Sequence, residues 1–168
     1  MSILKIETYP APVLKQKAAT IENIDDRLRQ LAEDMLETMY KAPGVGLAAP
    51  QVGESLRLIV ADPGEIEKPE PIVLINPQII AGEGKTAMKE GCLSVPGFTA
   101  EVERYQSIVI RAWTPDEKEI ELEVHDFPAI VFQHELDHLD GILFIDRISR
   151  LKRNIYERKL KKGTLEQD

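Results

Sequence analysis

Residues 129–139 read AIVFQHELDHL, a stretch with the dense apolar content of a helix that is buried on all sides. Asp126 is the predicted N-cap of this helix, and Pro128 falls in its first turn. The stretch is too short to span a membrane, and charged residues interrupt it. We therefore expect this helix to cross the core of the protein and the rest of the chain to pack around it.

The helix carries an H-E-x-x-H motif formed by His134, Glu135 and His138. Positions four apart on a helix face the same side, so both imidazoles can reach one metal ion. Glu135 can then reach a water molecule activated by that ion. The alternative is a pair of core histidines beside a buried glutamate, and burying those groups without partners would cost several kcal/mol. The motif favours a metal site.

A third ligand is needed, because catalytic divalent sites typically use three protein ligands and leave the fourth position to water. The patterns of H-E-x-x-H peptidases do not supply it: residue 144 is Phe144 where a third histidine would stand, and Glu157 is the only acid in the downstream basic segment. Cys92 is the only cysteine, and its thiolate suits zinc or ferrous iron. A free cysteine alone is more often a small buried apolar residue, so this interpretation depends on the histidine pair.

The flanking segments predict an α+β fold. Residues 25–41 form an amphipathic helix capped by Asn23 or Asp25, with apolar residues at Leu28, Leu31, Met35 and Met39. Short strand-like runs follow at Leu56–Ala61, Ile72–Ile75, Ile79 with Ile80, Ala100–Arg104, Ile108–Trp113 and Glu119–Val124. This order lacks the regular strand and helix alternation of a parallel sheet. We expect short, mostly antiparallel strands around the central H-E-x-x-H helix.

A basic helix ends the predicted fold. It begins after the cap Ser149, spans about 150–162, and has Leu151, Ile155 and Leu160 as its expected packing residues. Residues 147–162 hold eight Lys or Arg against one acid, a local charge of +7, so the remainder of a chain with net charge -8 carries -15. A solvated helix face and a docking surface both remain open for this segment.

Length and composition favour a single catalytic domain over residues 1–168. The start of the chain lacks the apolar core of a signal peptide, and a lone cysteine cannot form an intramolecular disulfide, so we expect a cytoplasmic protein. No apolar run is long enough for a membrane span, and the net negative charge argues against DNA as a partner.

Three segments together resemble the motifs of peptide deformylase in its bacterial form: GVGLAAPQ at 44–51, EGCLS at 90–94 and QHELDH at 133–138. The resemblance implies a hydrolase that removes the formyl group from the N-terminal formyl-methionine of new polypeptides and releases formate. It implies Cys92, His134 and His138 as ligands of one divalent ion, with Fe²⁺ as the expected ion. A Cys, His, His set also accepts Zn²⁺, Ni²⁺ or Co²⁺.

The same resemblance implies roles for other residues. Glu135 would move the proton, while the Gln51 amide and the backbone N–H of Leu93 would stabilise the oxyanion. Glu90 would pair with Arg104 and brace the cysteine loop, although a surface role for Arg104 is the competing interpretation. The residues expected to contact the substrate or shape its methionine pocket are Val45, Gly46, Met88, Glu90, Gly91, Phe127, Ile130 and Val131.

Two other functions compete with deformylation. One is a metallopeptidase that cuts internal bonds, and the other is a noncatalytic, metal-stabilised binding module that docks through the basic helix. The substrate implied by the resemblance emerges from ribosomes, so residues 147–162 could also dock on ribosomal RNA.

Overall fold

The computed structural model describes residues 2–163; Met1 and residues 164–168, the two ends of the predicted domain, lie outside the described residues. Three α-helices are present in this part of the chain: α1 (Asp26–Lys41), α2 (Asp126–Leu139) and α3 (Arg150–Lys162). The strands are β1 (Gly46–Ala48), β2 (Leu58–Ala61), β3 (Ile72–Glu83), β4 (Thr86–Cys92), β5 (Val95–Arg104), β6 (Ser107–Trp113) and β7 (Glu119–His125). Short 3-10 helices occupy Pro12–Lys15, Ala49–Val52 and Phe144–Asp146.

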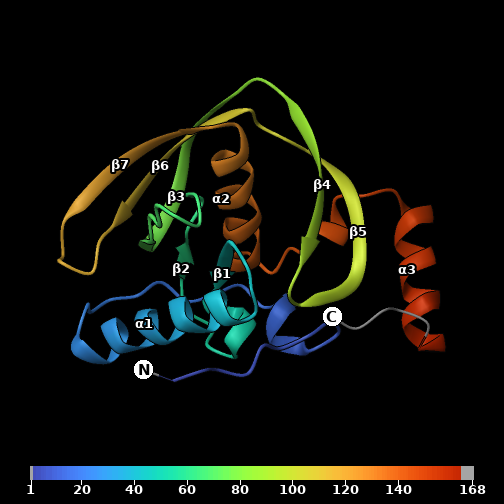
Figure 1. The fold of residues 1–168 in the computed structure, drawn as a ribbon, viewed down its shortest axis with the longest axis horizontal. Helices are drawn as coiled ribbons and strands as arrows, with labels where there is room; N and C mark the ends of the chain where they lie inside the picture. The colour runs from blue at the N-terminus through green and yellow to red at the C-terminus, as the bar shows by residue number, and fades with distance from the viewer. Residues whose placement is uncertain (1, 164–168) are drawn as a thin grey trace.

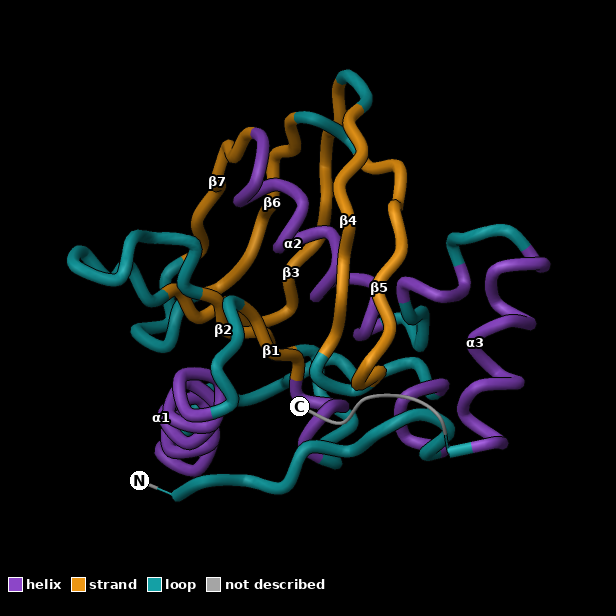
Figure 2. Tube along the Cα trace, turned by 45° about the vertical axis from the view of Figure 1, so that its right-hand side comes forward, coloured by secondary structure: helices purple, strands orange, loops and turns teal. Residues whose placement is uncertain are grey.

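Helix α2 lies between two antiparallel sheets (Figures 1 and 2). One sheet has five strands in the order β1-β2-β3-β6-β7, and the other is the two-stranded β4–β5 hairpin. All the strand pairs of both sheets are antiparallel. This arrangement confirms the predicted α+β class with a central helix.

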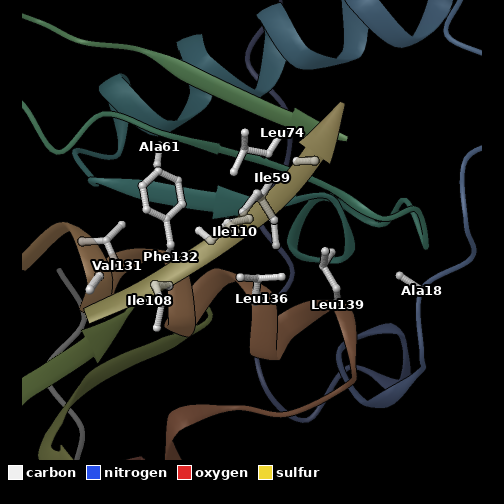
Figure 3. Close-up of a cluster of buried hydrophobic side chains, with 13 residues drawn as sticks. Ala18, Ile59, Ala61, Leu74, Ile108, Ile110, Val131, Phe132, Leu136 and Leu139 are labelled. Atoms are coloured by element: carbon white, nitrogen blue, oxygen red, sulfur yellow. The ribbon is translucent and has the colours of Figure 1, made fainter. Parts of the chain in front are cut away.

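The sheet side of α2 forms the main core, as Figure 3 shows. Phe132 and Leu139 are fully buried, and they pack against strand residues that include Ile59, Leu74 and Ile110. Every residue of α2 from 129 to 139 is buried. The expected helix through the core is therefore confirmed, and its other face is left for polar residues.

Helix α1 covers the β1–β2 end of the large sheet through the apolar face that its sequence predicts. Asp25 caps it by accepting a hydrogen bond from the Leu28 amide at 2.9 Å. Met35 and Met39 are fully buried against residues of β1 and β2. Of the two predicted caps, Asp25 is the one used.

The predicted N-cap of α2 is wrong. The cap is His125, the last residue of β7, and no side chain there hydrogen-bonds to the helix. Asp126 is the first helical residue and has a φ of 57°, so the chain turns directly from strand into helix at this position. The Asp126 carboxylate instead accepts a hydrogen bond from Gln106 Nε2 at 3.4 Å.

The sheets contain strand segments that the sequence did not predict. Strands β1 and β4 fall outside the expected runs, and β5 begins five residues earlier than expected, at Val95. The two short runs at 72–75 and 79–80 belong to one strand, β3, whose register shifts between Ile75 and Gln78. The positive φ of Asn76, 51°, lets the strand continue through this irregularity.

Helix α3 begins after Ser149 as predicted, because the Ser149 hydroxyl accepts a hydrogen bond from the Lys152 amide at 3.2 Å. Its predicted packing face is partly wrong: Leu151 is 67% exposed. Tyr156 is the fully buried residue instead, and its ring lies 4.8 Å from that of Phe98 in β5. The helix therefore docks on the β4–β5 side of the molecule through an aromatic contact.

Candidate active site

Cys92, His134 and His138 lie together between the β4–β5 hairpin and α2. Their ligand atoms are all within 4.8 Å of one another, and Cys92 Sγ is 3.4 Å from His138 Nε2. The histidines lie one helical turn apart on α2, and the cysteine is the last residue of β4. A thiolate and two imidazoles at these distances are a donor set that fits one divalent transition metal ion.

A buried carboxylate orients the first histidine. Glu90 Oε1 lies 3.0 Å from His134 Nδ1, a contact that leaves Nε2 available to a metal ion. Arg104 donates two hydrogen bonds to Glu90, at 2.9 and 2.8 Å, and its side chain is only 3% exposed. Burial alone would raise the pKa of Glu90, but the hydrogen bonds from Arg104 and His134 outweigh it and lower the pKa. The Glu90–Arg104 pair is thus buried, and the surface role for Arg104 is wrong.

Asp137 extends this charge network along α2. It accepts hydrogen bonds from Arg104 at 2.6 Å and from Arg147. Sequence reasoning missed both Asp137 and Arg147. The available signal was the acid itself, because an aspartate inside a helix predicted to be buried requires cationic partners.

Glu135 lines the same space as Cys92 and His134. Its side chain is 4% exposed, and Oε1 has no partner among the described residues. A Cβ atom added at Gly46 would stand 2.5 Å from Glu135 Oε2, so the glycine gives the carboxylate its room. Burial, opposed by the charges of His134 and Arg104, raises the pKa of Glu135 to about 7. A carboxyl group with such a pKa can both accept and donate a proton near neutral pH.

The Gln51 side chain is fixed beside Cys92. Gln51 Oε1 accepts a hydrogen bond from the Ala48 amide at 2.9 Å, which orients Nε2 toward the cysteine loop. Nε2 donates to Ser94 Oγ at 3.1 Å and lies 3.6 Å from Cys92 Sγ. Ser94, which sequence reasoning did not assign, also donates its backbone amide to Cys92 Sγ at 3.4 Å. An oriented amide N–H next to the presumed ligands is a suitable donor for a developing oxyanion.

A cavity of about 680 Å³ opens beside these groups. Every predicted catalytic, metal-ligating and substrate-binding residue except His138 lines it. Val45 and Phe127 are 45% and 39% exposed, so they line this cavity without being part of the buried core. The third histidine, His125, lies apart on the surface beside Ser107. The cavity combines apolar walls with a few convergent polar groups, as sites for small ligands do.

The fold, together with a cluster of Cys92, His134 and His138 that could hold a metal ion, fits the class of metal-dependent hydrolases. The chain belongs to the polypeptide deformylase family, because the model of that family matches residues 3–154. Its members remove N-formyl groups from nascent peptides, and this chain is an enzyme of that kind.

Relatives match over nearly the whole chain. The peptide deformylase of Syntrophobacter fumaroxidans is 53% identical over 163 residues, covering 96% of each chain. That of Thermodesulfovibrio yellowstonii is 50% identical and covers 96% of this chain and 98% of its own. The crystal structure of a peptide deformylase from Legionella pneumophila has a TM-score of 0.91 at 43% identity, with 97% of this chain and 96% of that chain covered.

The described residues contain no helix that is both long enough and apolar enough to cross a membrane.

Proposed function

We propose that Cys92, His134 and His138 hold the divalent ion on which deformylation depends, and that this ion is Fe²⁺. The observation that carries the proposal is the convergence of their three ligand atoms within 4.8 Å beside the Glu135 carboxylate. The bound ion would lower the pKa of a water molecule and polarise the formyl carbonyl. Zn²⁺, Ni²⁺ and Co²⁺ suit the same donors, so activity after anaerobic loading with each ion compares them directly.

The residues around the ion would divide the chemistry. Glu135 takes the proton of the attacking water and delivers it to the departing nitrogen. This role is supported by its Oε1 atom, which is buried and has no hydrogen-bond partner among the described residues. The Gln51 amide and the backbone N–H of Leu93 donate to the oxyanion of the tetrahedral intermediate. Glu90 and Arg104 keep His134 in place while this occurs.

The substrate would bind as an additional strand. Strand β1 is an edge of the five-stranded sheet, and its first residue, Gly46, lines the cavity. A peptide that pairs with this edge is held through its backbone, which tolerates many residues after the methionine. The methionine side chain enters the apolar part of the cavity, formed by Val45, Met88, Phe127, Ile130 and Val131, beside Gly91 of the cysteine loop.

Formate release from formyl-Met-Ala-Ser tests this assignment. Glu135→Gln should lower kcat by about 10²- to 10⁴-fold, the usual contribution of a general acid-base group, while metal content stays at the wild-type level. Cys92→Ser and His134→Gln should lose metal and activity together. His125→Gln, which changes the histidine outside the cavity, is the matched control and should remain active.

Two results would contradict the proposal. Full formate release together with full metal content in Cys92→Ser would show that another residue is the third ligand. Wild-type metal content in His134→Gln would show that this histidine does not hold the ion.

We also infer that residues 1–168 form one catalytic domain and that the protein works in the cytoplasm.

We further infer that α3 docks on ribosomal RNA. The support for docking is the +7 charge of residues 147–162 and the exposure of most of α3. Reversing several of these charges should abolish cosedimentation with ribosomes, and wild-type cosedimentation should fall steeply as salt rises. Unchanged cosedimentation of the reversed variant would contradict the docking.

A further inference from the structure

A second cavity, of about 410 Å³, lies between β5 and α3. These two elements stand side by side in both Figure 1 and Figure 2. Three residues, Lys89, Phe98 and Thr99, line this cavity and the active-site cavity at once. The second cavity, called the α3 groove below, therefore adjoins the active-site cavity at the wall that these three residues form.

The floor of the α3 groove is apolar and firmly supported. Phe98 and Ile155 line it, and Ile155 is 38% exposed. The Phe98 ring packs on Tyr156 at 4.8 Å and on Phe144 at 6.2 Å, so the wall shared with the active site rests on the core. Thr99, a short exposed side chain, lines both cavities.

The walls of the α3 groove are mainly cationic. Lys89 lies on β4 and Lys152 on α3, and neither forms an ion pair with another described residue. Glu101 is opposite Lys89 in the β4–β5 ladder, but no ion pair joins the two side chains. In a chain with a net charge of -8, a groove with two lysines that form no ion pair within residues 2–163 is complementary to acidic side chains.

We propose that the α3 groove binds the part of the formylated chain that follows its first few residues, and that Lys89 and Lys152 favour acidic side chains there. The inference rests on the proposed function, because it needs the formyl-methionine end of the chain in the active-site cavity. A peptide extended along the shared wall advances about 3.3 Å per residue, and the proposal is that the residues after the first few lie in the α3 groove. The groove then sets a preference among substrates that the methionine pocket cannot distinguish.

Three formylated peptides test the proposal: formyl-Met-Ala-Ser, and two seven-residue peptides that continue with Gly-Glu-Glu-Leu or Gly-Lys-Lys-Leu. The wild-type enzyme should prefer the acidic over the basic long peptide by about fivefold in kcat/KM, as expected of exposed ion pairs, with the difference in KM. The preference should shrink as ionic strength rises. Lys152→Glu should remove or invert the preference.

Lys161→Glu is the matched control. It makes the same charge change on the same helix, but nine residues from Lys152 and so on the opposite helical face, and it should keep the wild-type preference. Equal kcat/KM for the two long peptides, or equal effects of the two variants, would overturn the groove proposal. So would a Lys152→Glu variant that alters only ribosome cosedimentation. Absence of formate release from the short peptide would instead contradict the proposed function.

Discussion

Arg104 neutralises the buried acids around the first histidine. It donates to Glu90 and Asp137, and all three side chains are almost excluded from solvent. A guanidinium can serve two carboxylates at once because its donors diverge in a rigid plane. The position of His134 therefore depends on a residue that has no direct role in the reaction.

Replacing this arginine should be costly. Arg104→Met leaves Glu90 without its cation, so we expect the free energy of unfolding to fall by about 3–5 kcal/mol, as measured by urea denaturation. Metal affinity should weaken as well, because Arg104 no longer holds Glu90, the hydrogen-bond partner of His134, in place.

Arg111→Met is the control for this experiment. Its pair with Glu121 is about half exposed on the sheet surface, and its loss should cost about 1 kcal/mol or less. Equal losses in the two variants would show that the burial of the Arg104 pair is not what makes it important.

At the scale of elements, one face of α2 packs in the core and its other face lines the active-site cavity. Phe132 belongs to the core cluster under the large sheet, whereas Phe127 stands at the rim of the active-site cavity. Phe132→Ala should lower the free energy of unfolding by about 3–5 kcal/mol, the usual cost of emptying a core aromatic site.

Phe127→Ala should have the opposite profile. Its ring is 39% exposed, so we expect a stability change of about 1 kcal/mol or less and a several-fold rise in KM for formyl-Met-Ala-Ser. Denaturation and steady-state kinetics on both variants measure the contrast. A fall of about 3–5 kcal/mol in the free energy of unfolding of Phe127→Ala would instead show that this ring is part of the core.

The elements that sequence reasoning found are those with a strong periodic signal. The alternation in Glu119–Val124 predicts a strand with its glutamates on the solvent-facing side, and in β7 those glutamates are exposed while Ile120, Leu122 and Val124 pack on the core. Strand β4 reads TAMKEGC, which has neither alternation nor β-branched residues beyond Thr86, so only its pairing with β5 makes it a strand. The hairpin that positions Cys92 was therefore the least predictable part of the fold.

The predicted site residues converge because they lie in motifs or on one helix face. Cys92 and His138 are 46 positions apart, and only the H-E-x-x-H spacing indicated that a distant soft ligand was needed. Ser94 and Asp137 lie inside the quoted motifs, but their partners Gln51, Arg104 and Arg147 come from other segments, so these supporting contacts appear only in the fold.

At the scale of the molecule, Asp146 joins segments from both ends of the chain. It pairs with Lys15 at 2.7 Å, with Arg153 of α3, and accepts a hydrogen bond from the Leu143 amide at 2.9 Å. Burial alone would raise the pKa of Asp146, but these hydrogen bonds and charges outweigh it and lower the pKa.

The resulting pH dependence has a definite sign. The folded-state pKa is below the unfolded value of about 3.9, so the stabilisation is complete above about pH 4 and is lost as pH falls through the folded-state pKa. Asp146→Asn should therefore be less stable than wild type at pH 7, and the difference in free energy of unfolding should shrink below pH 4. A difference independent of pH between 7 and 3 would contradict this.

The two edges of the large sheet differ in what they offer to another chain. Strand β1 borders the active-site cavity, while β7, at the far edge, carries Glu119, Glu121 and Glu123 in alternation. Charged side chains on an edge strand discourage the pairing of a foreign strand. An enzyme whose substrates are unfolded chains meets many segments that could pair with an exposed strand. We expect the glutamates of β7 to discourage such pairing at the sheet edge that lies away from the active-site cavity.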